Sequence, residues 1–301
     1  MLPVLFSIGP IPISSFGFFL SLGFIYGSFL VWRLSRAWEL NVEKILDMII
    51  LTFFGGLIGA RIFFVALNFN FFSDDLLKSV LLTKYPGINF WGGLLGGWLT
   101  LFIFSNRFKF NFFQIADLAA IGVLGGIVFG DIGCFLGGCS IGKISNFFFA
   151  TSMVGALGKR FPVQILEAIL VGTLLFKLWP IASHFHISGA VLSKVLIFLG
   201  FIKLFTEFFR DINQGGYFLS LVMVGLGIFI HYQISKSSIK KDMFKFFWFI
   251  NGLFTNSNTW KLMFERIKKS WYNFIITWNL RFKSTGRFLR RARVKPTPKN
   301  F

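Results

Sequence analysis

Seven long apolar runs divide the greater part of the chain, and they restrict it to folds that a lipid bilayer permits. About 20 predominantly apolar residues are enough for a helix to cross the hydrocarbon core. The runs cover residues 11–32, 48–67, 88–104, from about 112 into a glycine-rich stretch, from about 163 to 179, 188–205 and 217–232. The sequence therefore predicts an all-α, polytopic membrane protein with seven transmembrane helices.

The composition agrees with a membrane location and separates the last part of the chain from the rest. Of 301 residues, 55% are hydrophobic and 14% are charged, which is typical of polytopic membrane proteins and excludes most soluble classes. Residues 233–301 carry 16 of the 31 Lys and Arg side chains against two acids, Asp242 and Glu265. We therefore expect a seven-helix transmembrane domain at 1–232 and a basic tail at 233–301.

The basic tail has the pattern of an amphipathic helix. Its large apolar side chains recur at spacings of three and four, and Lys and Arg fall between them. These side chains are Trp260, Phe264, Ile267, Trp271, Phe274, Trp278 and Phe282. The pattern favours a helix that binds an anionic membrane surface. Two alternatives stay open: an aromatic face that packs on another part of the protein, and a nucleic-acid arm, which suits the aromatic stripe less well. We expect no nucleic acid partner.

The distribution of positive charge predicts the orientation. Cytoplasmic loops carry an excess of Lys and Arg, and the tail has the largest excess, so we expect the C-terminus in the cytoplasm. Seven crossings then place the N-terminus outside, and the basic loops that begin at Arg33 and Arg107 fall inside. The loops with Arg160 and Arg210 fall outside, where these cations are candidates to hold a phosphate head group.

A glycine-rich stretch, GGIVFGDIGCFLGGCSIG at residues 125–142, ends the fourth run. Seven of its eighteen residues are glycine, so we expect the backbone to leave helical geometry there. Asp131 lies in its middle, and an ionisable residue inside an apolar segment indicates a functional site. The alternative is a glycine-rich contact between helices, with Asp131 at the water interface. Cys134 and Cys139 lack neighbouring metal ligands, and we expect them to be small apolar fillers without a disulfide framework.

Seven charged side chains lie within the apolar runs or at their ends, and they need a physical reason. Each intramembrane charge costs about 2.5–3.5 kcal/mol on insertion scales. They are Arg61, Asp117, Asp131, Glu167, Lys203, Glu207 and Arg210. The cations are suited to bind a phosphodiester, and the carboxylates to orient cations or to accept a proton. Paired structural ions that fix helix register, or a transporter that uses the same charges, are the alternatives.

Six short motifs resemble, in order and approximate spacing, those of the prolipoprotein diacylglyceryl transferases. The motifs are GGLIGARIFFV, FWGGLLGG, FFQIADLAA, GDIGCFLGGCSIG, RFPVQILEA and TEFFRDINQ, within residues 3–232. The resemblance implies a seven-helix enzyme of the bacterial inner membrane with its N-terminus outside. It further implies transfer of the diacylglyceryl group of phosphatidylglycerol to the lipobox cysteine thiol of prolipoproteins, with release of glycerol phosphate. No metal or cofactor is implied.

The resemblance extends to single residues, with some departures. Side chains of the family's type stand at Arg61, Asp117, Gln164, Glu167, Glu207 and Arg210. Asp131 stands where the family typically has an arginine associated with the lipid head group. Cys134 and Cys139 replace the more usual Asn and Glu, as in a cysteine-bearing subgroup. Trp91 and Phe161 replace histidines, and Phe16 replaces a tyrosine.

These residues define the predicted site. Arg210 is the candidate phosphate clamp, and Glu167 is the candidate base or orienter of the arginine. Arg61 or Arg160 is expected to replace the missing arginine, and Asp131 to pair with one of them if it is ionised. The predicted substrate-binding residues are Arg61, Asp117, Asp131, Gln164, Glu207, Arg160 and Trp91. A relative that binds lipid or prolipoprotein without catalysis is the main alternative, and a lipid transporter is the third.

Overall fold

The computed structural model describes residues 2–9, 11–73, 75–81, 85, 87–153, 155–211 and 216–235, together with residues 265 and 268. The chain divides into two units, residues 1–236 and 237–301, and the first unit is described below. The amphipathic helix predicted for residues 260–282 lies outside the described residues, apart from Glu265 and Lys268.

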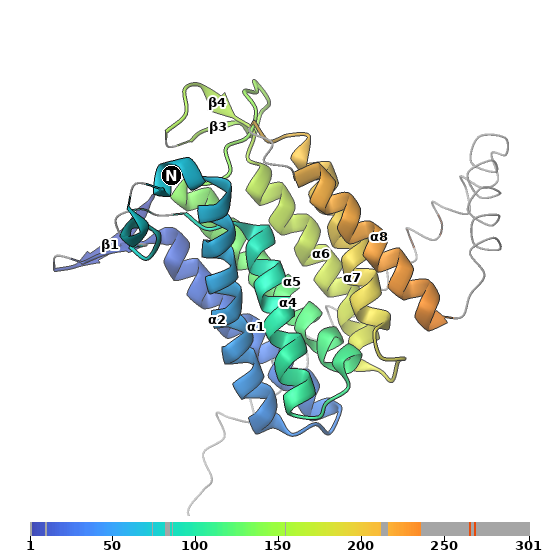
Figure 1. The fold of residues 1–301 in the computed structure, drawn as a ribbon. Helices are drawn as coiled ribbons and strands as arrows, with labels where there is room; N and C mark the ends of the chain where they lie inside the picture. Colours follow the sequence, from blue (N-terminus) through green and yellow to red (C-terminus); the bar gives the residue numbers. More distant parts are fainter. Residues whose placement is uncertain are drawn as a thin grey trace, which may run out of the picture. The chain divides into compact units, whose positions relative to one another are not determined.

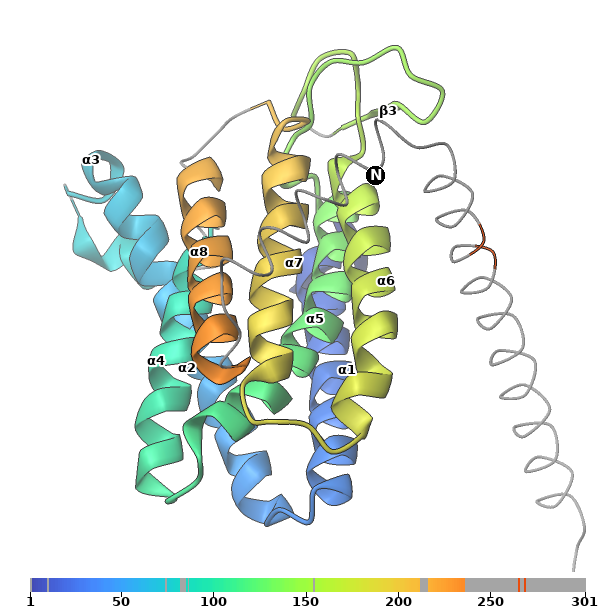
Figure 2. The ribbon, with the colours of Figure 1, turned by 90° about the vertical axis from the view of Figure 1, so that its right-hand side faces the viewer.

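Seven long helices form a bundle in the described part of the chain (Figure 1). They are α1 (Ser15–Ala37), α2 (Val42–Leu67), α4 (Phe90–Arg107), α5 (Phe112–Gly137), α6 (Val163–Ser183), α7 (Ala190–Glu207) and α8 (Gly216–Ser235). A short helix, α3 (Phe69–Phe72), and a 3-10 turn, η1 (Leu76–Ser79), lie between α2 and α4. The buried apolar side chains of α5, among them Leu118, Ile121 and Leu124, form the centre of the core. In Figure 2 the long helices run side by side along one common direction.

Five of these helices, α1, α2, α5, α6 and α8, are long and apolar enough to cross a membrane. The helix α7 is not among them, because its 18 residues include three charged side chains, Lys194, Lys203 and Glu207. Along α2, Phe54, Ile58 and Ile62 lie four residues apart and are 56–64% exposed. An exposed apolar stripe of this kind is costly in water and suited to lipid. The fold is therefore that of a helical membrane protein.

Four short strands correct the expectation of an all-α fold. The strands β1 (Val4–Ile8) and β2 (Ile11–Ser14) pair antiparallel, with Phe6 opposite Ile13. The first apolar run therefore does not start as a helix at Ile11. Ser14 ends the strand and caps α1, since its hydroxyl oxygen accepts a hydrogen bond from the N–H of Gly17 at 3.1 Å. The strands β3 (Thr151–Ser152) and β4 (Lys159–Arg160) form the second antiparallel pair.

Asparagine caps set the starts of three long helices. Asn41, Asn89 and Asn111 accept hydrogen bonds from N–H groups in the first turns of α2, α4 and α5. The helix α2 therefore begins six residues before the predicted apolar run at Met48, with Glu43 in its first turn. Hydropathy alone misses such polar first turns, whereas the cap residue marks them.

The glycine-rich stretch is helical for most of its length, which contradicts the expected departure from helical geometry. The helix α5 continues through Asp131 to Gly137 and ends at Gly138, whose φ of 80° is the left-handed conformation of a glycine C-cap. Its glycines bring α1 close: a Cβ added at Gly23 would lie 2.9 Å from the carbonyl oxygen of Gly126. The helix–helix contact is therefore the correct interpretation of the glycines.

A second glycine contact joins α2 and α4. It predicts that one added methyl group at this contact lowers the stability of the protein. A Cβ at Gly59 would lie 2.6 Å from the carbonyl oxygen of Gly92 and 2.7 Å from Cα of Gly96. We expect Gly59→Ala to lower the stability by about 1–3 kcal/mol, because the two backbones must separate. Thermal unfolding in detergent measures this. Gly225→Ala in α8 is the control, since a Cβ there meets nothing within 4 Å, and equal stability of both variants would contradict the prediction.

Candidate functional site

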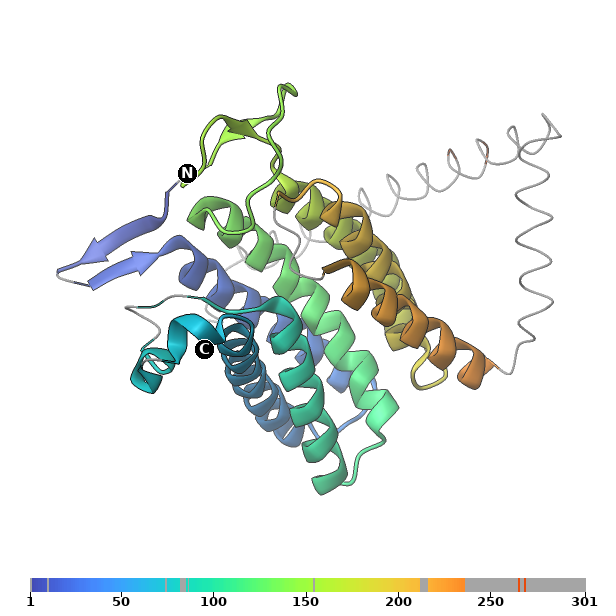
Figure 3. The same cartoon turned by 45° about the horizontal axis from the view of Figure 1, so that its top comes forward.

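One end of the bundle is closed by the segment that connects α5 to α6. This segment carries β3 and β4 and extends beyond the helix ends (Figure 3). It is joined to the chain after α7 by backbone hydrogen bonds, from Lys143 N–H to Phe209 O at 2.8 Å and from Asp211 N–H to Ile141 O at 3.1 Å. The guanidinium of Arg160 adds an ion pair of 2.6 Å with Asp211. The ends of α5, α6 and α7 are thereby held together.

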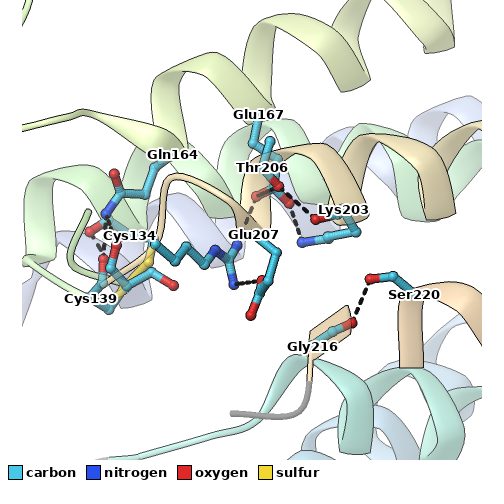
Figure 4. Close-up of polar contacts among 11 residues, drawn as sticks. Cys134, Cys139, Gln164, Glu167, Lys203, Thr206, Glu207, Gly216 and Ser220 are labelled. Carbon is cyan, nitrogen blue, oxygen red and sulfur yellow. Dashed lines mark hydrogen bonds and ion pairs between the residues drawn. A yellow bond between two sulfur atoms is a disulfide. The ribbon is translucent and has the colours of Figure 1, made fainter. Parts of the chain in front are cut away.

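Glu167 is the centre of a buried ion-pair cluster at this end (Figure 4). It lies in the second turn of α6 and is completely buried. One carboxylate oxygen, Oε1, pairs with the ammonium of Lys203, and the other, Oε2, pairs with Nη2 of Arg210 at 2.8 Å. The hydroxyl of Thr206 donates to Oε2 at 3.4 Å. A carboxylate held by two cations in this way is a positioning group for both of them.

Arg210 connects Glu167 to the second carboxylate of the cluster. Its Nη1 lies 3.5 Å from Oε2 of Glu207, and its side chain is 22% exposed. The remaining donor, Nε, is buried and has no hydrogen-bond partner among the described residues. Lys203 is held from the other side, because its ammonium lies 3.8 Å from the centre of the Phe90 ring. Among the described residues, the cluster therefore has an unpaired buried donor at Nε of Arg210.

Asp131 faces this cluster from α5. It interacts electrostatically with Glu167, Lys203 and Arg210, and its Oδ2 is buried without a hydrogen-bond partner among the described residues. The expected pairing of Asp131 with Arg61 or Arg160 is not what the contacts give. Arg160 pairs with Asp211, and Arg61 donates to backbone carbonyls near α4.

Gln164 lies one turn before Glu167 and holds the segment that follows α5. Its amide nitrogen donates to the carbonyl oxygens of Cys139 at 2.5 Å and Ser140 at 2.8 Å. Cys134 and Cys139 are joined in a disulfide, so the expectation of separate apolar fillers is wrong (Figure 4). The disulfide closes the turn that presents these carbonyls, and Oε1 of Gln164 remains buried without a hydrogen-bond partner in the described structure.

The remaining predicted residues take separate positions. Arg61 donates from Nε to Ser79 O at 2.7 Å and from Nη1 to Gly87 O at 2.8 Å, which fixes the connection between α2 and α4. Trp91 lies in the first turn of α4, directly after the Phe90 that contacts Lys203. Arg61 and Trp91 therefore hold or flank the start of α4, and Phe90 of this helix contacts Lys203 of the Glu167 cluster.

Asp117 lies far from the cluster. It is fourteen residues before Asp131 on α5, which corresponds to about 21 Å along a helix. Its carboxylate is fully buried and accepts hydrogen bonds of 2.6 Å from the N–H groups of Gly189 and Leu192. His186 lies 3.4 Å away. These contacts make Asp117 the cap of α7.

Lys203 is the cluster residue that the sequence analysis counted among the seven charges but did not include in the predicted site. Lys203, Glu207 and Arg210 are spaced by four and three residues, so they share one face of α7 and its extension. This spacing was the feature of the sequence that could have placed Lys203 in the predicted site. In the part of the chain that the structure describes, no group of three or more His, Cys, Asp or Glu side chains is placed to hold a metal ion.

Comparisons with known proteins point to one family. A family model described as prolipoprotein diacylglyceryl transferase matches residues 3–233. The chain is 30% identical over 233 residues to the phosphatidylglycerol–prolipoprotein diacylglyceryl transferase of Rickettsia rickettsii (strain Sheila Smith), covering 74% of this chain and 89% of the relative. For the protein of the same name from Buchnera aphidicola subsp. Acyrthosiphon pisum (strain 5A), the identity is 30% over 280 residues, covering 79% and 97%. For that of Deinococcus radiodurans it is 36% over 149 residues, covering 48% and 44%.

Proposed function

Because the chain belongs to the prolipoprotein diacylglyceryl transferase family, we propose that it transfers the diacylglyceryl group of phosphatidylglycerol to the cysteine thiol of prolipoproteins. The observation that carries this proposal is the buried cluster of Glu167, Lys203 and Arg210 at one end of an apolar bundle. Two cations at membrane depth need a functional reason, and an anionic phospholipid head group supplies one. The comparisons do not favour a relative that binds lipid without catalysis.

The cations of the cluster stabilise the leaving group. The sulfur of the acceptor attacks the terminal carbon of the diacylglyceryl group, and the bond from that carbon to the phosphate oxygen breaks. Negative charge then develops on the phosphate, where Arg210 and Lys203 stabilise it. Glu167 holds both cations in position before the lipid arrives, so little reorganisation is needed during the reaction.

The acceptor thiol must lose its proton, since a free cysteine has a pKa of about 8.5. Glu207 is the better proton acceptor of the two glutamates, because its ion pair with Arg210 is long, at 3.5 Å, whereas Glu167 pairs with Arg210 at 2.8 Å and also with Lys203. The positive charges of Lys203 and Arg210 also favour the thiolate. The proton ends on the released glycerol phosphate. Gln164 supports the site by holding the segment after α5 in place.

A transfer assay tests the proposal. Purified protein in vesicles that contain phosphatidylglycerol should convert a synthetic lipobox peptide to its diacylglyceryl thioether and release an equal amount of glycerol phosphate. Arg210→Ala should lower the rate by about 100- to 1,000-fold, as removal of a group that stabilises transition-state charge does. The control is Arg33→Ala, which should retain the wild-type rate. Arg33 is exposed and lies near the C-terminal end of α1. An unmodified peptide with well-folded wild-type protein would overturn the proposal.

We further propose that all seven long helices cross the bacterial inner membrane, with the N-terminus outside. The basic residues at the turns before α2 and α5 support this orientation. Reporter fusions after Lys109 and Lys241 should therefore show a cytoplasmic location, and a fusion after Lys159 an outer one. An outer location at Lys241 would contradict the orientation and the number of crossings. The basic tail, residues 233–301, is proposed to bind the anionic inner face of the membrane.

A further inference from the structure

The segment between α5 and α6 exposes a patch of large apolar side chains. The segment lies beyond the ends of α6 and α7 (Figure 2). The side chains of this apolar patch are 57–90% exposed, and they are Ile144, Phe147, Phe148, Phe149 and Leu157. The ring centroids of Phe148 and Phe149 are 5.1 Å apart, and those of Phe147 and Phe149 are 5.8 Å apart. Exposed apolar side chains gathered in this way mark an interaction surface.

Paired backbone holds the apolar patch in place. The N–H of Ser145 donates to the carbonyl oxygen of Lys159, and the N–H of Phe161 donates to that of Lys143, both at 3.0 Å. Between these two bonds, Ile144 pairs with Arg160 in an antiparallel bridge. The strands β3 and β4 pair on the other side of Arg160. The exposure of the apolar patch is therefore a property of the fold.

The length of α6 places the apolar patch at the level of the lipid head groups. The helix α6 is apolar enough to cross a membrane and has 21 residues, from Val163 to Ser183. A helix of this length extends about 31 Å, which matches the hydrocarbon core of about 30 Å. The residues just before Val163 then lie where the hydrocarbon core ends. The segment that carries the apolar patch therefore lies at the membrane interface.

The apolar patch is continuous with the exposed apolar surface of α7. Four exposed phenylalanines recur along α7 at spacings of three and four, as in a stripe that faces lipid, and they are Phe198, Phe201, Phe205 and Phe208. The ring of Phe205 lies 5.3 Å from that of Phe209, which stacks on Phe161 at 5.0 Å. Phe161 in turn lies 6.2 Å from Phe147 of the patch. Lipid that covers α7 therefore reaches the apolar patch without crossing a polar surface.

The charges beside the apolar patch have one sign. The sequence has no acidic residue between Asp131 and Glu167. Lys143 and Lys159 are exposed where the segment pairs with itself, whereas Arg160 pairs with Asp211. A lysine beside apolar surface lays its alkyl stem along that surface and extends its ammonium to the head groups. Anionic phospholipid complements these cations, whereas a second copy of the chain would present the same cations and repel them.

We propose that the apolar patch inserts into the membrane interface at this end of the bundle, with Lys143 and Lys159 on anionic lipid head groups. This inference does not depend on the proposed transfer reaction. It has a consequence for the Glu167 cluster, because Gly142 pairs with Arg210 in a β-bridge and the N–H of Lys143 donates to the carbonyl oxygen of Phe209. The inserted segment thereby fixes the depth at which Arg210 is held.

Fluorescence quenching measures the depth of the apolar patch. Full-length Phe148→Cys protein carries the fluorophore NBD at the new cysteine, in vesicles of phosphatidylcholine and phosphatidylglycerol. We expect nitroxide lipids labelled near the head group to quench NBD more than lipids labelled deep in the acyl chain, and aqueous iodide to quench it weakly. Phe54→Cys is the matched control, since Phe54 is an exposed phenylalanine near the middle of α2, where the deep nitroxide should quench more.

Two outcomes would overturn the membrane anchor. The first is that iodide quenches NBD at position 148 as freely as it quenches NBD-cysteine in solution, while nitroxide lipids have no effect. If a lipobox peptide then shields the label, the apolar patch docks the acceptor protein instead. The second is that nitroxide quenching persists after Phe147→Ser and Phe149→Ser are added, because the label itself would then enter the lipid. We expect this quenching to be lost.

The lysines are tested by the lipid charge. Two fluorescence lifetimes give the ratio of inserted to water-exposed label at position 148. Phosphatidylglycerol should raise this ratio over that in pure phosphatidylcholine, and Lys143→Gln with Lys159→Gln should lower it by about fivefold for each lysine. Lys44→Gln with Lys109→Gln, exposed at the other end of the bundle, should leave it unchanged. An equal ratio in both lipids would overturn the role of the lysines.

Discussion

Glu167→Gln is expected to lower the rate of diacylglyceryl transfer by about 100- to 1,000-fold, the usual cost of losing a group on which transition-state stabilisation depends. Glu167 is completely buried and holds both Lys203 and Arg210 through separate carboxylate oxygens. Glutamine has a similar shape but no charge, so the two cations are left to repel each other. They then no longer occupy the positions in which they bind the developing phosphate charge.

Loss of folding must be separated from loss of chemistry, because breaking a buried ion pair costs about 3–5 kcal/mol. The rate is therefore measured per folded protein, with size-exclusion chromatography and thermal unfolding in detergent on the same samples. Lys203→Arg keeps both the cation and the pairing and should retain transfer. Glu43→Gln makes the same chemical change at an exposed position in the first turn of α2 and should leave the rate unchanged. A folded Glu167→Gln protein with the wild-type rate would contradict the prediction.

Asp117→Ala is expected to lower the stability by about 2–5 kcal/mol, because each buried donor left without an acceptor costs about 1–3 kcal/mol. The carboxylate of Asp117 accepts hydrogen bonds from the N–H groups of Gly189 and Leu192 at the start of α7. Without the carboxylate, these two N–H groups lose their acceptor. The N-cap residue of α7 is Gly189, which makes no side-chain hydrogen bond that could replace it. Thermal unfolding and proteolysis at residues 184–189 measure the effect.

The same variant distinguishes a structural role from substrate binding. Asp117→Asn keeps one carbonyl acceptor and should recover part of the stability, and Asp47→Asn is the exposed control. If Asp117→Ala unfolds like the wild type but loses affinity for the donor lipid, the residue belongs to the substrate site and the capping role is wrong. The distance of Asp117 from Asp131 along α5 favours the cap.

The sequence predicted the long helices well because their cause is local. Apolar runs of spanning length mark the seven helices, and the asparagine caps at positions 41, 89 and 111 set three of their starts. The hairpin of β1 and β2 was missed because it is as apolar as the run that follows it. The glycines of α5 were misjudged for a different reason: their effect depends on α1, which lies opposite them, and a single segment does not reveal its neighbour.

The cluster was only partly predictable, since pairing between helices is set by packing. Glu167 and Arg210 stood out as charges in apolar surroundings, and the structure brings them together at 2.8 Å. Their third member, Lys203, was visible as a charge, yet nothing in the sequence showed which acid it would meet. Asp117 had the same chemical signature as Asp131, but one caps a helix and the other faces the cations. A charged residue inside an apolar run indicates that its side chain has a partner, but the sequence does not identify the partner residue.

The ion pairs of Glu167 have a consequence for the biogenesis of the protein. Glu167 is synthesised with α6, whereas both of its cationic partners belong to α7 and the residues just after it. At about 5–20 residues per second, α6 is complete for some seconds before Lys203 and Arg210 leave the ribosome. During that interval the carboxylate has neither cation, and α6 must wait in the translocon or near its polar lining. The helix α7 and the residues just after it therefore complete the insertion of α6, and a chain that stops short of α7 leaves Glu167 without either cation.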